Sequence, residues 1–354
     1  MKQATTTITH VIHSGGFYGA ERMLVDHCLA TEPYIDSSVV LLSPPAALLK
    51  RFTDYGIDCV GCDSLNAFVA YTKNRSTIIN AHNFKAQIYA WIAARKNRLP
   101  LIFTQHGFTP RSVKQHLYMW ASLLLCKTST VKNVVCVAKS IALLHKKFRV
   151  ADRKIHVIAN GLANKPAVTR QETQSSIGFI GRLSMEKGPD LFLQAVIPLL
   201  RKNQYAQALF LGDGPLLGVL EDQVTSQDLT EQVQFLGYQD NINSWLSKLS
   251  VLVISSRTEG TPMVLLEAMQ ARLPVVAFNV GGIPDVIRHN KEGLLAPALD
   301  TKTLQAQIEK VLTAPAYASE LAEHAQQRQM QHYSLEHNAQ QWLKVYTNTQ
   351  ESLA

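Results

Sequence analysis

Short apolar runs alternate with segments of helical periodicity along most of this chain. In the first half, such runs predict buried strands at residues 8–13, 38–42, 57–60, 77–80, 101–104, 134–137 and 155–158. In the second half, they predict strands at residues 176–180, 208–211, 233–236, 251–254 and 275–278. Strands that alternate with helices in this way are typical of parallel α/β sheets.

A polar segment at residues 160–175 follows neither periodicity and is typical of a linker. We therefore predict two Rossmann-like, doubly wound α/β domains, at residues 1–165 and 166–335, that face each other across a cleft. Ligands of such folds bind at the carboxyl ends of the strands. Apolar and aromatic residues at helical spacing predict a packed final helix at residues 336–354.

The composition indicates an ordinary water-soluble protein, because 354 residues with 46% hydrophobic content suit two domains. No apolar run approaches the roughly 18 residues of a membrane span. The N-terminal segment has one lysine and a brief apolar stretch, which predicts a strand and not a secretory signal. We therefore expect a cytoplasmic location. Cys59 and Cys62 form a CxxC without a second pair, so we expect them to be reduced and structural.

Charge changes this picture, because the two halves differ in sign. Residues 1–165 contain 21 Lys or Arg and 8 Asp or Glu, a balance of 21 − 8 = +13, whereas residues 166–354 contain 14 and 19, a balance of −5. Residues 64–151 hold 14 basic side chains and no acidic one. Such a surface attracts nucleic acid, an anionic membrane or a phosphorylated acceptor. A solvated, solubilising face is the plainer interpretation.

Two glutamates lie eight positions apart beyond the predicted strand 251–254. Glu259 falls in the loop after the strand, and Pro262 is predicted as the first residue of a helix that carries Glu267. The free N–H groups and the positive dipole at this helix start favour an anion such as phosphate. The carboxylates would then face neutral hydroxyls at the two ends of the ligand, a layout that a sugar nucleotide has. A capping Glu259 and a solvent-facing Glu267 are the structural alternative.

A second loop of the same domain carries two cations. In GRLSMEKGPD, Arg182 and Lys187 flank the turn between the predicted strand 176–180 and a helix that starts at Gly188 and Pro189. Two cations at the carboxyl end of a strand can clamp a diphosphate and stabilise charge on a leaving group. An ordinary surface Arg and Lys would give the same pattern in isolation.

The first domain carries weaker signals. Gly15 and Gly16 follow the first strand, but the spacing is not GxGxxG, which argues against a dehydrogenase. His106 directly follows a strand, where it can hydrogen-bond phosphate or sugar hydroxyls, although a lone histidine is more often structural. No HxH, HExxH or Asp-x-Asp motif occurs, so we expect no metal and no other cofactor. Walker, GxSxG and kinase motifs are also absent from the sequence.

Taken together, these motifs resemble the retaining GT-B glycosyltransferases of glycosyltransferase family 4. EGTPMVLLEAM carries the E-x7-E element of that family and GRLSMEKG its Arg and Lys loop, while LGDGP, FLGY and PVVAFNVGGIPDVI are also similar. The resemblance covers nearly the whole chain, but the first half matches only in its glycine loop and in TQHG. It implies a GT-B fold whose closing helix packs back on the first domain, and catalysis without metal by a front-face reaction.

The resemblance also implies roles for particular residues. Arg182 and Lys187 would hold the donor diphosphate, Glu259 a sugar hydroxyl and Glu267 the ribose, with His106 close to the donor sugar. We expect catalytic roles for His106, Arg182, Lys187 and Glu259. The donor-binding set is Gly15, Gly16, Gly212, Gly260, Thr261, Pro262, Met263, Val264 and Glu267.

The predicted function is transfer of a sugar, with retained configuration, from a UDP- or GDP-linked donor to a saccharide or lipid-linked acceptor. The basic first half favours lipopolysaccharide or exopolysaccharide assembly on the inner face of the cytoplasmic membrane. Three alternatives stay open: a GT-B epimerase, a GT-B phosphorylase and a basic nucleic-acid-binding protein. The last lacks stacking motifs and leaves the two glutamates unexplained.

Overall fold

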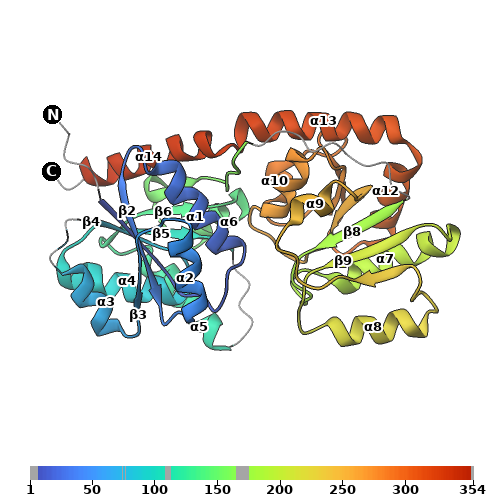
Figure 1. Ribbon diagram of the computed structural model, residues 1–354. Coiled ribbons are helices and arrows are strands. Elements are labelled where there is room, and N and C mark those ends of the chain that lie inside the picture. The colour runs from blue at the N-terminus through green and yellow to red at the C-terminus, as the bar shows by residue number, and fades with distance from the viewer. Residues whose placement is uncertain (1–6, 74, 76, 108–112, 165–174, 352–354) are drawn as a thin grey trace. The chain divides into compact units, whose positions relative to one another are not determined.

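A computed structural model describes residues 7–73, 75, 77–107, 113–164 and 175–351, with the backbone alone considered at residues 113–115. The chain divides into two compact units (Figure 1). Unit 1 comprises Met1–Ala163 with Leu335–Ala354, and unit 2 comprises Asn164–Ser334.

Unit 1 is built on a parallel sheet with the strand order β3-β2-β1-β4-β5-β6-β7. Its strands are β1 (Thr7–Ile12), β2 (Asp36–Leu42), β3 (Cys59–Cys62), β4 (Thr77–Ala81), β5 (Leu101–Gln105), β6 (Val131–Cys136) and β7 (Ile155–Val157). The helices are α1 (Gly19–Thr31), α2 (Ala46–Asp54), α3 (Leu65–Thr72), α4 (Phe84–Asn97), α5 (Val113–Leu125), α6 (Lys139–Lys147), η1 (Asp152–Lys154) and α14 (Leu335–Glu351). Because β1 lies beside β4, and β4 beside β5, the loops after these three strands meet at one edge of the sheet.

The last helix of the chain belongs to the core of unit 1. Trp342, Val345 and Tyr346 of α14 are buried together with Ile8 of β1 and Ile78 of β4. The first turn of the helix is fastened by Leu162, whose carbonyl accepts the Leu335 N–H at 3.1 Å. These contacts explain why the apolar residues of this helix recur at helical spacing.

Unit 2 is built on a second parallel sheet with the strand order β10-β9-β8-β11-β12-β13. Its strands are β8 (Ser176–Ile180), β9 (Gln207–Leu211), β10 (Val233–Phe235), β11 (Val251–Ile254), β12 (Val275–Phe278) and β13 (Leu294–Ala296). The helices are α7 (Pro189–Lys202), α8 (Leu217–Ser226), α9 (Ile242–Leu246), α10 (Met263–Gln270), α11 (Ile283–Val286), α12 (Thr301–Thr313) and α13 (Pro315–His332).

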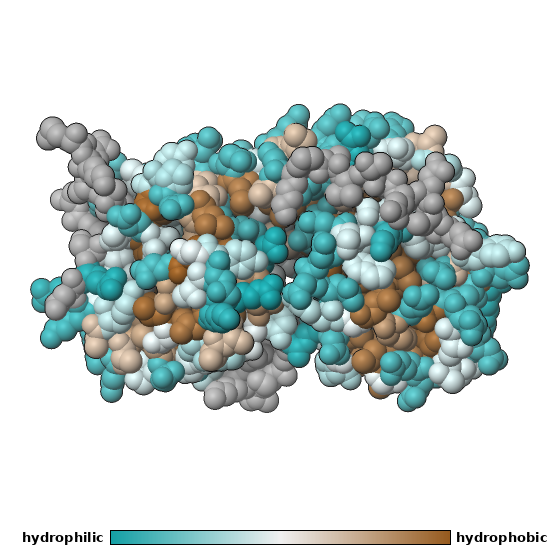
Figure 2. Space-filling view, in the orientation of Figure 1, coloured by the Kyte–Doolittle hydropathy of each residue, from teal (hydrophilic) through white to brown (hydrophobic). Residues whose placement is uncertain are grey.

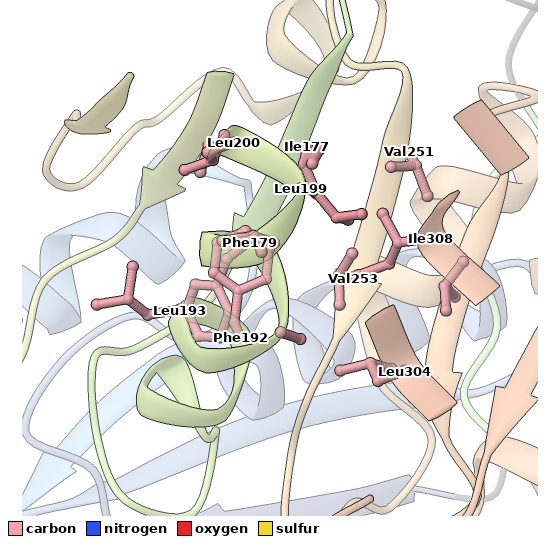
Figure 3. Packing of buried hydrophobic residues seen from close by; sticks show 14 of the residues in the cluster. Ile177, Phe179, Phe192, Leu193, Leu199, Leu200, Val251, Val253, Leu304 and Ile308 are labelled. Carbon is pink, nitrogen blue, oxygen red and sulfur yellow. The ribbon is translucent and has the colours of Figure 1, made fainter. Parts of the chain in front are cut away.

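The core of unit 2 packs α7 and α12 against the sheet (Figure 3). Phe192 of α7 meets Phe210 of β9 edge to face, with ring centroids 4.9 Å apart. Leu304 and Ile308 of α12 are fully buried in the same cluster as Val253 of β11. Such burial stabilises each side chain by about 1.5–3 kcal/mol relative to water. It also fixes the strands whose ends carry the site.

Most of the predicted strands are confirmed within one to three residues. Strand β13 was not predicted, because Leu294–Ala296 is a short edge strand without a long apolar run. The start of α10 was also predicted one residue early. Pro262 has an extended backbone, with ψ of 128°, and precedes the first helical residue, Met263. The predicted linker lies largely outside the described residues.

Polar residues dominate the face seen in Figure 2, with apolar patches on both units. Within the described residues, the helices are too short or too polar to cross a membrane.

Candidate active site

In unit 2, the loops that follow β8 and β11 are in close backbone contact at the carboxyl edge of the sheet. Gly188 adopts a left-handed backbone with φ of +65°, and a Cβ there would lie 2.1 Å from the carbonyl oxygen of Ser255. The Ser255 hydroxyl donates a hydrogen bond to the Gly188 carbonyl at 2.7 Å. Only glycine allows this approach, which places the Arg and Lys loop against the glutamate loop.

The loop after β12 also contacts the glutamate loop, at the backbone of Glu259. Gly281 has a φ of +57°, and a Cβ added to it would lie 1.9 Å from the Glu259 carbonyl oxygen. The Gly282 N–H donates to this oxygen at 3.2 Å. The backbone of Glu259 is therefore held by a close contact that no side chain at Gly281 would permit.

The two loops bring together Lys187 and Glu259, which are 72 residues apart in the chain. Lys187 Nζ donates to Glu259 Oε1 at 2.7 Å and to Oε2 at 3.0 Å. The Ser256 hydroxyl adds a hydrogen bond of 2.6 Å to Oε1. The carboxylate side chain is 7% exposed and the lysine side chain 34% exposed. The pair thus has a fixed geometry, and its lysine remains open to water.

Arg182 is exposed at the beginning of the same loop. Within the described residues, its side chain has no hydrogen bond or ion pair, although its carbonyl accepts the Ser184 N–H at 2.8 Å. An exposed guanidinium beside a fixed lysine can form two parallel hydrogen bonds with a phosphate.

The predicted donor-binding residues of unit 2 lie in the loop after β11, on α10 and in the loop after β9. Gly260 and Thr261 follow Glu259, and Met263 opens α10, whose first N–H groups have no helical partners. Pro262 contributes no N–H and ends the loop in an extended conformation. Glu267 lies on the second turn of α10 and is partly exposed. The structure thus keeps the two glutamates in different elements, one in a loop and one on a helix.

Gly212 lies in the neighbouring loop after β9. A Cβ on this residue would be 2.0 Å from the carbonyl oxygen of Gly181, and its N–H donates to Gly237 at 2.8 Å. The Leu183 N–H donates to the Asp213 carbonyl at 2.9 Å, so the loops after β8 and β9 are tied together. The structure therefore brings Gly212 to the same edge of the sheet as the Arg and Lys loop.

An ion pair that the sequence analysis missed fastens the glutamate loop to α7. Arg257 donates to both carboxylate oxygens of Asp190, at 2.9 and 2.6 Å, and to the Met185 carbonyl at 2.7 Å. Burial by itself would raise the pKa of Asp190, but hydrogen bonds and charge from Arg257 outweigh it and hold the pKa below its usual range. Asp190 ends the quoted GRLSMEKGPD segment, and Arg257 lies two residues before Glu259, so their position next to the two loops was the available signal.

This pair predicts a pH-dependent contribution to stability. A carboxylate with a lowered folded-state pKa stabilises the fold above its unfolded pKa, roughly 3.9, and loses that contribution as the pH falls through the folded pKa. Because the pair is partly exposed, we expect Asp190→Asn to lower the unfolding midpoint at pH 7 by no more than about 4 °C. Calorimetry should show this difference shrinking below about pH 4. A difference that grows in acid would contradict the assignment.

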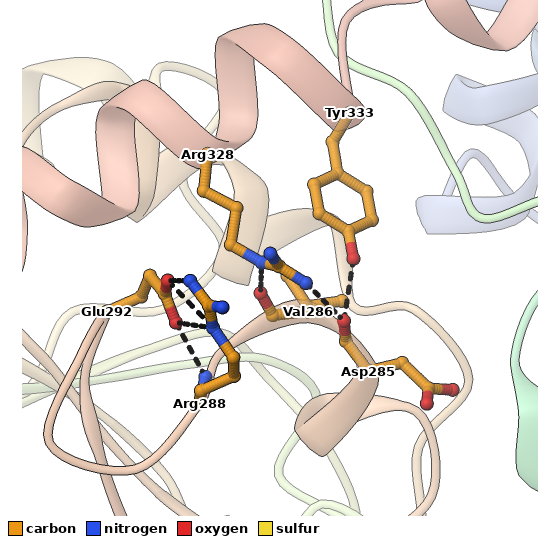
Figure 4. Close-up of polar contacts among 6 residues, drawn as sticks. All are labelled: Asp285, Val286, Arg288, Glu292, Arg328 and Tyr333. Carbon is orange, nitrogen blue, oxygen red and sulfur yellow. Dashed lines mark hydrogen bonds and ion pairs between the residues drawn. The ribbon is translucent and has the colours of Figure 1, made fainter.

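Contacts from the end of α13 hold the loop that contains Gly281. Arg328 donates to the carbonyls of Val286 and Asp285 at 2.8 and 3.2 Å, and the Tyr333 hydroxyl donates to Asp285 at 2.7 Å (Figure 4). These carbonyls belong to the short helix α11, which directly follows the loop containing Gly281. The contacts therefore limit movement of the loop that supports Glu259.

The candidate residues of unit 1 lie in the loops after β1, β4 and β5. Asn83 donates to the His13 carbonyl at 2.6 Å and joins the loop of Gly15 and Gly16 to the start of α4. His106 follows β5, and its Nε2 lies 3.2 Å from Nδ1 of a histidine in the β4 loop. Although His106 retains some exposed surface, burial lowers its pKa to about 4. Its ring is therefore neutral at physiological pH.

Two family models match separate parts of the chain. "Glycosyltransferase Family 4" matches residues 37–163 and "Glycosyl transferases group 1" matches residues 174–314. Among curated proteins, the Escherichia coli UDP-Gal:alpha-D-GlcNAc-diphosphoundecaprenol alpha-1,3-galactosyltransferase is 28% identical, over 63% of this chain and 63% of its own. A Campylobacter jejuni alpha-1,4-N-acetyl-D-galactosaminyltransferase is 32% identical, over 49% of this chain and 48% of its own. The match spans less than two thirds of either relative.

Solved structures resemble the chain over almost its whole length. HepE of Anabaena in complex with UDP-glucose has a TM-score of 0.87 at 20% identity, covering 97% of this chain and 99% of that one. The lipopolysaccharide outer core galactosyltransferase WaaB has a TM-score of 0.74 at 17% identity, covering 99% and 100%. These likenesses confirm the predicted fold class, two parallel-sheet α/β domains of the GT-B type.

Proposed function

This chain belongs to the GT-B glycosyltransferases of family 4, and from that premise we propose that it transfers a sugar from a nucleoside diphosphate sugar to a saccharide acceptor. The proposal includes retention of the anomeric configuration and a UDP- or GDP-linked donor. It also includes a role in the assembly of cell-surface glycans on the inner face of the cytoplasmic membrane.

The observation that carries the proposal is the contact between Lys187 and Glu259 at the carboxyl edge of the unit 2 sheet. The largely buried carboxylate can accept a hydrogen bond from a sugar hydroxyl, and the accessible ammonium beside it can bind a phosphate. The start of α10 adds the N–H groups of its first turn, and the N-terminal end of a helix favours phosphate oxygens. A nucleoside diphosphate sugar presents both kinds of group.

The reaction needs stabilisation of negative charge on the departing diphosphate. Lys187 and Arg182 supply the compensating positive charge from one loop. Hydrogen-bond donors that are in place before the reaction require no reorganisation. The leaving phosphate is then placed to help accept the proton of the attacking hydroxyl. We infer that no divalent metal is required, because these cations and the α10 N-terminus neutralise the diphosphate. Undiminished transfer in EDTA tests this inference.

The relatives support a lipid-linked acceptor. The name of the Escherichia coli relative specifies a UDP-linked galactose and a diphosphoundecaprenol-linked acceptor, and that of the Campylobacter jejuni relative specifies an undecaprenol-linked saccharide. Both acceptors are anionic and hydrophobic. They would suit the basic first half of this chain.

A panel of UDP- and GDP-sugars tests the donor assignment. We expect one member to raise the unfolding midpoint and to be hydrolysed slowly without an acceptor, because bound ligand stabilises the folded state. The anomer formed on an acceptor, identified by its proton NMR coupling, should match that of the donor. Conversion to a different sugar nucleotide without acceptor would indicate the epimerase alternative. Absence of any shift across the panel would contradict donor binding.

We also propose that unit 1 binds an anionic membrane surface through α5 and the neighbouring end of α6. Leu117, Trp120 and Leu124 of α5 are exposed at a spacing that puts them on one helix face. Trp120 packs on Phe148 just after α6, with ring centroids 5.0 Å apart. The exposed lysines at this end of α6 are Lys146, whose Nζ lies 3.5 Å from Asp152 Oδ1, and Lys147. Apolar side chains flanked by lysines are typical of helices that lie on anionic lipid.

Vesicle flotation tests this membrane surface. We expect binding to vesicles of phosphatidylglycerol that weakens with salt, and a loss of at least about tenfold in the double variant Lys146→Glu, Lys147→Glu. Trp120→Ser should also weaken binding, because it removes the largest apolar side chain of the face. The matched control is Val219→Ser, an exposed apolar position of unit 2. Salt-independent flotation, or an equal effect of the control, would contradict the assignment.

A further inference from the structure

Behind His106, three more histidines continue as a row into the core of unit 1. His106 Nε2 lies 3.2 Å from His82 Nδ1, and His82 Nε2 lies 2.9 Å from His10 Nδ1. The His10 ring meets His27 edge to face, with centroids 5.1 Å apart. His27 Nε2 lies 3.0 Å from the hydroxyl of Tyr346. The row therefore connects the loop after β5 to α14.

All members behind His106 are buried, at 3% exposure or less. They come from β1, α1, the loop after β4 and α14, so the sheet order brings them together and not the sequence. Within the described residues, no group of three His, Cys, Asp or Glu side chains is arranged to hold a metal ion. Burial lowers the pKa of His27 to about 4 and the pKa of His10 and His82 below the usual value, with neighbouring histidines adding to the last two. Each ring is thus neutral and carries one N–H.

The far end of the row is held by Asn80. Asn80 Nδ2 donates to the Tyr346 hydroxyl oxygen at 3.1 Å, and Asn80 Oδ1 accepts the Thr104 hydroxyl at 2.6 Å. The Tyr346 hydroxyl either donates to His27 Nε2 or accepts a second hydrogen bond from it, according to the tautomer of His27. His27 contacts His10 only ring edge to ring face, so its tautomer does not set the protonation of the other three rings.

The other three rings can be protonated in two ways. If His106 donates from Nε2, then His82 donates from Nε2 and His10 carries its proton on a buried Nε2 that has no partner among the described residues. A buried N–H group of His10 would then be unpaired. In the reverse direction, His10 donates to His82 and His82 donates to His106, and the unpaired atom of His10 is a lone pair. A buried N–H without a partner is the rarer and more costly defect.

We propose that His82 and His10 are positioning residues that hold His106 as its Nδ1–H tautomer. His106 Nε2 accepts from His82, and its Nδ1–H, which has no partner among the residues that the structure describes, can donate to an oxygen atom. Under the proposed function, on which this assignment of a ligand rests, that oxygen belongs to a sugar hydroxyl or a phosphate of a substrate. Because the ring is neutral, the N–H donates to this oxygen without placing a positive charge beside it.

The tautomer is measured directly in the ligand-free protein. In the full chain labelled with ¹⁵N-histidine, long-range proton–nitrogen correlation spectra distinguish protonated from bare ring nitrogens, and His106→Gln identifies the His106 signals. We expect Nδ1 protonated and Nε2 bare. A protonated Nε2 in the wild-type chain overturns the proposal, whether or not any variant folds. This spectrum does not depend on transferase activity, so a failure of the proposed function would be distinguishable.

Two substitutions at His82 test positioning in the reaction. His82→Asn retains an amide donor where the Nδ1–H was, and it should preserve the His106 tautomer and at least half of kcat/KM. His82→Leu removes the donor, so His106 should become a mixture of tautomers and kcat/KM should fall about tenfold. His145→Leu is the matched control, because His145 is a fully buried histidine of unit 1 outside the row. Equal losses in His82→Leu and His145→Leu with an unchanged His106 spectrum would refute the positioning role.

Discussion

Lys187→Ala is expected to lower the rate of sugar transfer at least about 100-fold, the scale of losing one preorganised electrostatic contact. In the wild type, the ammonium binds both oxygens of Glu259 and remains partly open to solvent. Its removal deprives the leaving diphosphate of a cation and leaves a largely buried carboxylate unpaired. An unpaired negative charge beside the diphosphate adds repulsion, so the effect should exceed that of losing a cation alone.

Steady-state kinetics with a matched control separates this effect from general loss of charge. Lys202→Ala also removes a lysine from unit 2 that pairs with a glutamate, because Lys202 Nζ lies 2.9 Å from Glu309 Oε1. That pair is exposed, at 61% and 40%, so activity should stay close to wild type. Arg182→Ala removes a cation without leaving a carboxylate unpaired, so it should lower transfer about 100-fold, a smaller loss than that of Lys187→Ala. Near-normal turnover in both Arg182→Ala and Lys187→Ala would rule out the proposed clamp.

Gly281→Ala is expected to reduce transfer by a similar factor although it removes no functional group. The new Cβ would lie 1.9 Å from the Glu259 carbonyl oxygen, and the φ of +57° is disfavoured for alanine. The glutamate loop must shift, and displacement of a positioning residue by about 1 Å can lower a rate 100-fold. Strain of this kind should also reduce stability by about 1–3 kcal/mol.

Gly218→Ala is the control for this substitution. Gly218 lies in α8, and a Cβ there has no neighbour within 4 Å, so the change should be neutral or slightly stabilising. Denaturant unfolding and kinetics of both variants check the expectation. If Gly281→Ala retained wild-type turnover, the rigid support of Glu259 would not matter for the reaction.

The sequence predicted the parallel sheets because buried strands carry continuous apolar runs, as at Val251–Ile254. It also placed Lys187 and Glu259 in loops that leave strands, and parallel strands bring such loops to one edge. The ion pair between the two residues was not predicted, since it depends on the order β8-β11 in the sheet. Strand order is a long-range property that local patterns do not carry.

The histidine row was not predicted either, because it also depends on strand order. His10 lies within an apolar strand, and His82 follows another strand 72 residues later, so neither forms a recognisable motif. Their contact requires β1 to pair with β4, and the contact with Tyr346 requires α14 to pack on the same unit. The short edge strand β13 was missed for a different reason, because three residues are too few for a periodic signal.

The binding of a nucleoside diphosphate measures directly whether the loops around Lys187 and Glu259 form a donor site. Isothermal titration of UDP and GDP into the wild type, Lys187→Ala and Lys202→Ala separates this site from general electrostatics. We expect one nucleotide to bind the wild type and Lys202→Ala equally and Lys187→Ala at least about tenfold more weakly, since charge-assisted contacts are worth roughly 1.5–3 kcal/mol. Equal affinity of all three proteins, or no binding of either nucleotide, would contradict this expectation.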